Sequence, residues 1–178
     1  MNYLVQSLTY FRIFIAPVIF LLVTFYNYYG WALFLFIVAS SSDYWDGFLA
    51  RKYNLESALG EVIDPIADKI LVTFLILALS VELSSIFFAF AGGLILVREF
   101  WVSALRDLNA RTSNLEATSV TFLSKFKTVI QFITFASFLL GLYLNNSLLI
   151  FISNFFLFLA LLITIKTGLS YTIGTFKK

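Results

Sequence analysis

Residues 31–68 read WALFLFIVASSSDYWDGFLARKYNLESALGEVIDPIAD. An apolar run at the start of an expected membrane-spanning helix leads directly into a segment with four aspartates, Asp43, Asp46, Asp64 and Asp68. An ionised aspartate at the centre of a bilayer is unfavourable by about 2.5 to 3.5 kcal/mol on insertion scales. Four of them on neighbouring segments predict a partner that neutralises them, and a pair of divalent cations is the partner that we expect.

The composition is that of a membrane protein. Hydrophobic residues make up 61% of the 178 residues and charged residues 12%, whereas soluble domains have about 45–50% apolar and about 25% charged residues. No polar stretch is long enough for a separate soluble domain, so we expect one transmembrane domain over residues 1–178. The net charge of only +2 and the lack of a basic stripe argue against nucleic acid as a partner.

Six apolar stretches predict an all-α integral membrane fold with six transmembrane helices. We expect the spans at Leu8–Tyr26, Trp31–Leu49, Asp64–Val81, Ser85–Leu105, Phe122–Leu144 and Leu148–Tyr171. The first stretch has no obvious small-residue cleavage site after it, so it is expected to be a retained span rather than a signal peptide. We expect the Phe-rich last span to contact lipid only.

The connections between the spans alternate in charge. The very short turns near Asn27–Gly30, Glu82–Ser84 and Asn145–Ser147 contain no Lys or Arg. The other connections and the end of the chain carry Arg51, Lys52, Arg106, Arg111, Lys177 and Lys178. The positive-inside rule makes this side cytoplasmic. We therefore expect a multi-pass protein of the cytoplasmic (inner) membrane, with both termini and an aspartate-rich active site facing the cytoplasm.

The spacing of the aspartates places them on two helix faces. Asp43 and Asp46 are three residues apart and Asp64 and Asp68 four apart, so each pair shares one face of its helix. Two helices joined by a short turn are expected to be antiparallel neighbours, so the acidic faces can meet. Carboxylates this close cannot all stay ionised without compensation. Two bound metal ions would compensate them and could clamp the oxygens of a displacement at phosphorus.

The absence of His and Cys narrows the chemistry. A metal bound by carboxylates alone should be a hard cation such as Mg²⁺ or Mn²⁺. Any general base must be a carboxylate, Lys, Tyr or water. Small Gly47 and Ala50 would let a ligand approach the acidic face, and Arg51 offers a fork for phosphate oxygens.

Each of these residues also has a structural alternative. Asp64 precedes Pro65, and this pair is typical of a helix start with Asp64 as its N-cap. Gly47 could be a packing glycine and Arg51 a cytoplasmic anchor. These alternatives explain the residues one at a time, but not the whole pattern.

Residues 43–68 match the pattern D-x2-D-G-x2-A-R-x8-G-x3-D-x3-D at every fixed position. In this the chain resembles the CDP-alcohol phosphatidyltransferase family. The resemblance implies a six-span membrane enzyme that uses an alcohol to displace CMP from CDP-diacylglycerol with two Mg²⁺ or Mn²⁺ ions. It also implies a homodimer that works in contact with membrane lipids.

The resemblance also implies roles for individual residues. Asp43, Asp46, Asp64 and Asp68 would be metal ligands, and Asp68 would also be the general base that takes the proton of the acceptor hydroxyl. Contacts to CDP-diacylglycerol would come from Gly47, Ala50, Arg51, Ser57, Thr9 and Arg12.

Shorter motifs are similar to the branch of the family whose acceptor is glycerol 3-phosphate. They are the segments Ser7–Arg12, Asp64–Lys69, Arg98–Arg106 and Lys125–Thr128. Ala104 and Ser124 stand where this branch usually has glycine. The shorter motifs imply that glycerol 3-phosphate is the second substrate.

Four basic residues are candidates for binding the acceptor phosphate: Arg98, Arg106, Lys125 and Lys127. Cations buried in a membrane protein usually face a polar cavity or a counter-ion, and an acceptor phosphate would be that counter-ion. The alternative is that they extend to lipid headgroups. Glu99 is not expected to contact Arg98, because neighbours in sequence point apart on a helix.

Other functions remain open at this point. The same reaction could use inositol phosphate, phosphatidylglycerol or serine as the acceptor. A cation-coupled transporter would be expected to show internal repeats and matched helix breaks near the bilayer midplane, and the sequence shows neither. A non-catalytic assembly subunit would require the aspartates to be dispensable.

Overall fold

The structure is a computed structural model, and it describes residues 2–53, 58–112, 114 and 122–177. Within these ranges, the side chains of residues 2–6, 8, 43–53 and 58–62 lie outside the description. The chain forms six helices: α1 (Asn2–Thr24), α2 (Tyr29–Tyr53), α3 (Ala58–Leu83), α4 (Ile86–Arg111), α5 (Phe122–Tyr143) and α6 (Ser147–Phe176). The described ranges contain no strand, so the predicted all-α fold with six helices is confirmed.

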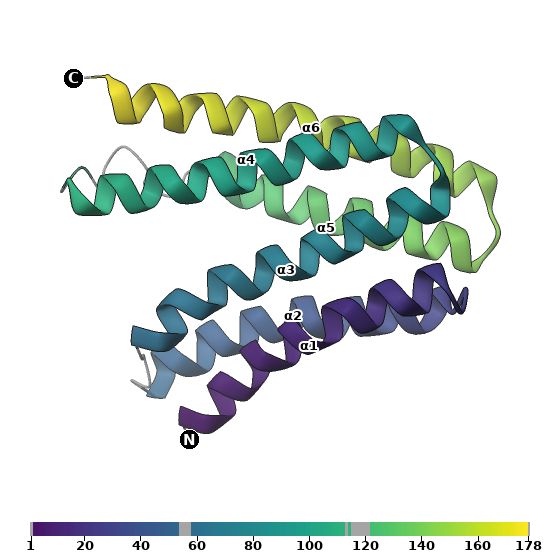
Figure 1. Ribbon diagram of the computed structural model, residues 1–178, viewed down its shortest axis with the longest axis horizontal. Helices are drawn as coiled ribbons and strands as arrows, with labels where there is room; N and C mark the ends of the chain where they lie inside the picture. Colours follow the sequence, from purple (N-terminus) through teal and green to yellow (C-terminus); the bar gives the residue numbers. More distant parts are fainter. Residues whose placement is uncertain (1, 54–57, 113, 115–121, 178) are drawn as a thin grey trace.

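The helices lie side by side and alternate in direction (Figure 1). Helix α1 packs against α2 and α3, while α6 packs against α4 and α5. Contacts of α3 with α4 and of α2 with α5 join the two groups. Both ends of the chain lie at the same end of the bundle as the last turn of α2 and the first turn of α3 (Figure 1). This arrangement agrees with the predicted position of the aspartate-bearing helix ends.

The three short turns predicted from the sequence are present at the opposite end of the bundle. Asn27, Ser84 and Asn145 each adopt a positive φ there, of 54°, 46° and 48°. Asparagine enters this left-handed region more readily than most residues, which suits it to a tight helix connection. The next helix starts at once, since the side chain of Asn146 accepts a hydrogen bond of 3.1 Å from the backbone N–H of Leu149.

The core between the helices combines aromatic rings with small residues. Phe36 on α2 stacks on Phe132 of α5 with ring centroids 5.1 Å apart. Gly92 on α4 faces α3, and a Cβ added there would lie 2.6 Å from Cγ2 of Ile76. The close approach of α4 to α3 therefore requires glycine at this position.

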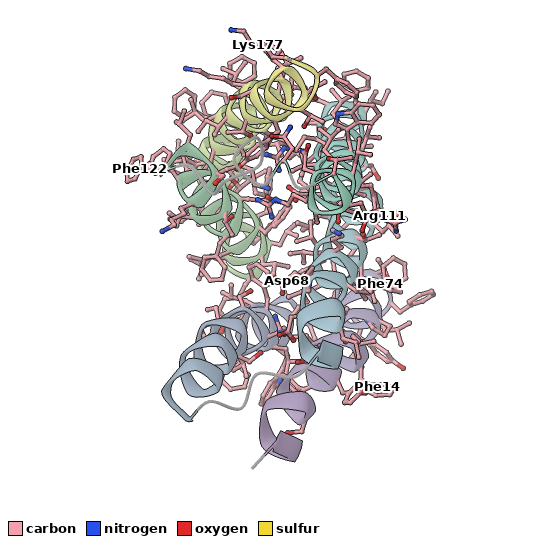
Figure 2. The ribbon with its side chains drawn as sticks, turned by 90° about the vertical axis from the view of Figure 1, so that its left-hand side faces the viewer. Phe14, Asp68, Phe74, Arg111, Phe122 and Lys177 are labelled. Carbon is pink, nitrogen blue, oxygen red and sulfur yellow. The ribbon has the colours of Figure 1, made fainter. Side chains whose placement is uncertain are left out.

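The outer surface is apolar, as expected for contact with lipid. Phe14 and Phe122 are 72% and 81% exposed, and Figure 2 shows both rings at the periphery of the bundle. Among the described residues, α4, α5 and α6 are long and apolar enough to cross a membrane. Two shorter apolar helices cover Thr9–Thr24 and Tyr29–Ser42. These features identify the chain as a membrane protein.

Candidate active site

The first helix of the chain binds two of the four aspartates. Thr9 donates from Oγ1 to Oδ1 of Asp64 at 2.6 Å. Arg12 donates from Nη1 to Oδ1 of Asp68 at 2.5 Å, and its Nη2 lies 3.4 Å from Oδ1 of Asp64. Thr9 and Arg12 are both buried, so α1 holds the two carboxylates of α3 from inside the bundle. The family resemblance had implied that Thr9 and Arg12 contact CDP-diacylglycerol, and it did not indicate this pairing.

Asp64 is not a helix cap. Helix α3 begins at Ala58, so Asp64 and Pro65 both lie inside it. Proline has no backbone N–H and cannot donate to the carbonyl of Glu61 four residues earlier. The capping interpretation of Asp64 is therefore wrong, and its carboxylate is directed to Thr9 and Arg12 instead.

The second acidic pair lies on a continuous helix. Helix α2 runs without interruption from Tyr29 to Tyr53, so the backbone positions of Asp43 and Asp46 share one helix face, as predicted. The predicted ligand-binding residues whose side chains lie outside the description are Asp43, Asp46, Gly47, Ala50 and Arg51. Ser57 lies outside the described residues altogether.

The part of the site that the structure describes fits a hard cation. The side chains of Asp64 and Asp68 are 35% and 48% exposed, so a ligand can reach them although Arg12 beside them is fully buried. A carboxylate has about four lone-pair sites, and a contact from Arg12 or Thr9 uses only one of them. Among the described side chains, no group of three or more acidic, His or Cys residues could hold a metal ion. The metal site therefore stays a prediction that depends on Asp43 and Asp46.

Three of the four basic candidates lie in or beside one polar cluster between α4, α5 and α6. Arg98 donates from Nη2 to Oγ1 of Thr167 at 2.8 Å. The guanidinium carbons of Arg98 and Arg106 lie 5.8 and 5.6 Å from the centre of the Tyr171 ring, within the range of cation–π contacts. The buried Lys127 forms an ion pair with Glu99. Figure 2 shows nitrogen atoms gathered between these three helices. Lys125, two residues before the buried Lys127 on α5, is exposed.

The expectation for Glu99 was wrong. Its Oε1 lies 3.5 Å from Nη1 of Arg98 and also pairs with Lys127. Neighbouring residues leave a helix in different directions, but both side chains are long enough to turn toward the same space. The positive charge of Lys127 on α5 draws Glu99 toward that space. Glu99 therefore balances two cations of the cluster.

Helix α6 contributes to the cluster, which the sequence interpretation missed. We expected only lipid contact from this span, and Phe151 and Phe155 are indeed 72% and 59% exposed. The buried face of the helix, however, carries Thr167 and Tyr171, one turn apart. Polar residues that recur at helical spacing in an otherwise apolar span were the signal that could have revealed this face.

A hydrogen bond connects α3, which carries Asp64 and Asp68, to α4, which carries Arg98 and Arg106. Lys69, the residue after Asp68, donates from Nζ to Oγ of Ser103 on α4 at 2.5 Å. Ser103 lies between Arg98 and Arg106 in the sequence, on the helix that carries both arginines. The contact therefore fixes the acidic site relative to the basic cluster.

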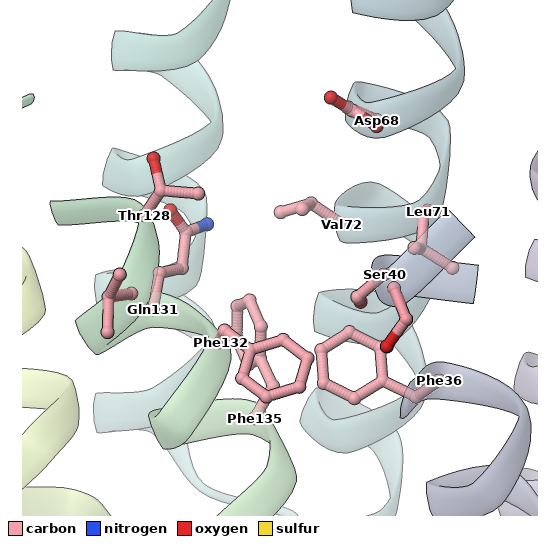
Figure 3. Close-up of a pocket in the computed structure, with 11 residues that line it drawn as sticks. Phe36, Ser40, Asp68, Leu71, Val72, Thr128, Gln131, Phe132 and Phe135 are labelled. Atoms are coloured by element: carbon pink, nitrogen blue, oxygen red, sulfur yellow. The ribbon is translucent and has the colours of Figure 1, made fainter. Parts of the chain in front are cut away.

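A cavity of about 350 Å³ adjoins Asp68. Its walls come from α2, α3 and α5, and they are mostly apolar, with Phe36, Phe132 and Phe135 at one end. Figure 3 shows Asp68 on α3 and Gln131 on α5 extending into this space from opposite sides. A volume of this size lies within the range of about 300–1,000 Å³ that is usual for ligand pockets.

The chain is similar to known proteins over most of its length. A family model described as CDP-alcohol phosphatidyltransferase matches residues 3–166. Three relatives carry the name CDP-diacylglycerol–glycerol-3-phosphate 3-phosphatidyltransferase. The relative from Rickettsia typhi is 36% identical, with 96% of each chain covered. The relative from Rickettsia bellii is 38% identical over 77% of this chain and 74% of its own. The relative from Salmonella choleraesuis is 33% identical, with 72% of each chain covered.

Proposed function

Since the chain belongs to the CDP-alcohol phosphatidyltransferase family, we propose that it transfers the phosphatidyl group of CDP-diacylglycerol to sn-glycerol 3-phosphate. The products are phosphatidylglycerophosphate and CMP. The observation that carries this proposal is the complete aspartate signature on α2 and α3 in a chain that the family model matches over residues 3–166. The names of the relatives support glycerol 3-phosphate as the acceptor.

The reaction is a displacement at one phosphorus atom. The primary hydroxyl oxygen of glycerol 3-phosphate attacks the phosphorus that carries the diacylglycerol group. The bond from this phosphorus to the bridging oxygen breaks, and CMP leaves with the electron pair. Asp68 accepts the proton of the attacking hydroxyl. The ion pair with Arg12 holds the Asp68 carboxylate in place for this step.

The aspartates would also hold the metal ions. Asp43, Asp46, Asp64 and Asp68 are the proposed ligands of two Mg²⁺ or Mn²⁺ ions. When bound, these ions would neutralise the diphosphate and polarise the attacked phosphorus. The oxygen donors and the exposed carboxylates of Asp64 and Asp68 support this assignment.

The basic cluster is the proposed binding site for the acceptor phosphate. Arg98 and Arg106 present planar guanidinium groups, which suit phosphate oxygens. Lys127 adds a third cation, and Glu99 balances part of this charge. Lys125, which is exposed, would act nearer the entrance.

The proposed location is the inner membrane, with the active site at the cytoplasmic end. The arginines and lysines in the longer connections and at the end of the chain support this orientation. The homodimer implied by the family resemblance stays a prediction.

A CMP-release assay with purified protein tests the proposed function. CDP-diacylglycerol is combined with glycerol 3-phosphate, inositol phosphate, serine or phosphatidylglycerol, each with and without Mg²⁺ or Mn²⁺. We expect CMP only with a divalent ion and predominantly with glycerol 3-phosphate. Faster release with another acceptor would overturn the assigned substrate, and release without a divalent ion would overturn the metal assignment.

A further inference from the structure

The cavity beside Asp68 contains a buried hydrogen-bond donor that has no acceptor among the side chains that the structure describes. Gln131 on α5 is only 6% exposed. Among the described residues, no acceptor lies within hydrogen-bond distance of its Nε2 atom. A buried polar group without a partner is unfavourable, and most such groups in folded proteins are satisfied. The amide of Gln131 therefore suits a ligand that brings an acceptor oxygen into the cavity.

The direction of the amide also suits a hydrogen bond to a ligand in the cavity. Figure 3 shows the amide nitrogen of Gln131 directed away from α5, toward the α3 side of the cavity. Thr128 on the same wall differs, because its hydroxyl already donates to the backbone carbonyl of Ser124 at 3.3 Å. The two polar side chains of this wall can therefore be distinguished experimentally.

The remaining walls indicate what kind of molecule carries the acceptor oxygen. Apart from Asp68 and a few other polar residues, the cavity is lined by aliphatic and aromatic side chains, including Leu71, Val72 and Phe132. An alkyl chain fits such walls. However, lipid tails are already in apolar surroundings in the bilayer, so apolar walls admit a chain without selecting it. Selection must come from a polar contact, and Gln131 is placed to provide one.

From this combination we infer that the cavity takes one acyl chain of the CDP-linked lipid, and that Gln131 donates a hydrogen bond from Nε2 to its ester carbonyl oxygen. The inference rests on the proposed function, because it assigns the lipid substrate of that reaction to a particular cavity. Gln131 thereby becomes a specificity residue that distinguishes ester-linked from ether-linked lipids. An ether-linked chain has the same apolar body but no carbonyl oxygen.

Paired lipid substrates test the inference. CMP release is measured with CDP-diacylglycerol and with CDP-dialkylglycerol of equal chain length, at saturating glycerol 3-phosphate. One hydrogen bond contributes about 0.5–1.5 kcal/mol, so the wild-type protein should prefer the ester by up to about tenfold in kcat/KM. Gln131→Met keeps a similar length without the amide and should bring the two substrates to equal kcat/KM. Thr128→Val, the matched control, should keep the ester preference.

Defined outcomes would overturn the inference. It is wrong if the wild-type protein uses both lipids equally, or if Gln131→Met keeps the wild-type preference. It is also wrong if Gln131→Met instead removes a preference for glycerol 3-phosphate over 1,3-propanediol phosphate, because Gln131 would then bind the secondary hydroxyl of glycerol 3-phosphate, which 1,3-propanediol phosphate lacks. Thermal unfolding of each variant shows whether it folds, and Gln131→Leu replaces Gln131→Met if that variant does not.

A binding measurement separates this inference from the proposed function. Stabilisation of the wild-type protein and of Gln131→Met against heat is measured with each of the two lipids, without any acceptor. Absence of CMP release in the assay, together with ester-selective stabilisation that depends on Gln131, would refute the proposed function and support the cavity assignment. CMP release with no ester selectivity in either measurement would support the proposed function and refute the cavity assignment.

Discussion

Nη1 of Arg12 lies 2.5 Å from Oδ1 of Asp68, and the two side chains differ sharply in exposure. Arg12 is fully buried, whereas the side chain of Asp68 is 48% exposed. The aspartate can be solvated without its partner, but the arginine cannot. The stability of this part of the bundle therefore depends on keeping at least one acidic partner for Arg12.

Replacing both acidic partners of Arg12 should destabilise the protein more than the sum of the single replacements. Asp64→Asn or Asp68→Asn alone leaves one carboxylate beside Arg12, and each should lower the free energy of unfolding by about 1–2 kcal/mol at most. The double variant removes both described acidic partners of a buried cation and should lose about 3–5 kcal/mol. Thermal unfolding of the four proteins in one detergent measures the coupling. Additive effects would show that Arg12 does not depend on this pair.

Removing the proposed base should stop turnover without unfolding the protein. Asp68→Asn cannot accept the proton of the acceptor hydroxyl, so kcat should fall by about 10²- to 10⁴-fold. CMP release measures the effect. Asp107→Asn is the matched control, because Asp107 is an exposed carboxylate that pairs with Arg111 in an i,i+4 contact of 2.9 Å. Near-wild-type turnover of Asp68→Asn would exclude the assigned role.

Arg98→Ala should impair the use of glycerol 3-phosphate more than the use of CDP-diacylglycerol. Loss of a charged hydrogen bond to the acceptor phosphate is expected to weaken binding by about 1.5–3 kcal/mol, which raises the KM for glycerol 3-phosphate by about 10- to 100-fold. The KM for CDP-diacylglycerol should change much less. Steady-state kinetics with each substrate varied in turn gives both values. Equal losses for the two substrates would mean that Arg98 has a structural role.

A glycine on α6 provides a milder test of the same site. A Cβ added to Gly168 would lie 3.0 Å from Cγ of Arg98, so Gly168→Ala should displace the arginine. Overpacking typically costs about 1–3 kcal/mol, and we expect an increase of about tenfold in the KM for glycerol 3-phosphate. Gly93→Ala is the control, because a Cβ there meets nothing within 4 Å. An unchanged KM in Gly168→Ala would show that the position of Arg98 is not critical.

Much of the fold could be predicted from the sequence, because length and apolar composition define membrane helices without reference to their neighbours. The six helices and the short turns at Asn27 and Asn145 were predicted correctly. Helix ends in charged segments were less predictable. Helix α3 extends back to Ala58, past the expected start at Asp64, because Pro65 is tolerated inside it.

The contacts within the site could be predicted only in part. Helical spacing shows which residues of one helix share a face, as it did for Asp64 and Asp68. It does not show which other helix covers that face, and so the contacts of Arg12 with these aspartates and of Thr167 with Arg98 were missed. Gln131 was missed for the same reason, since only the packing of α2, α3 and α5 creates a cavity around it.

The ion pair of Arg12 also bears on the order in which the chain is made. Helix α1 leaves the ribosome before α3, so Arg12 is synthesised some fifty residues ahead of Asp64 and Asp68. Until α3 enters the membrane, α1 holds a cation in an apolar helix without the two aspartates that it contacts in the folded bundle, which is unfavourable. The first helix therefore gains these two contacts only when the third arrives, which links the final packing of α1 to the insertion of α3.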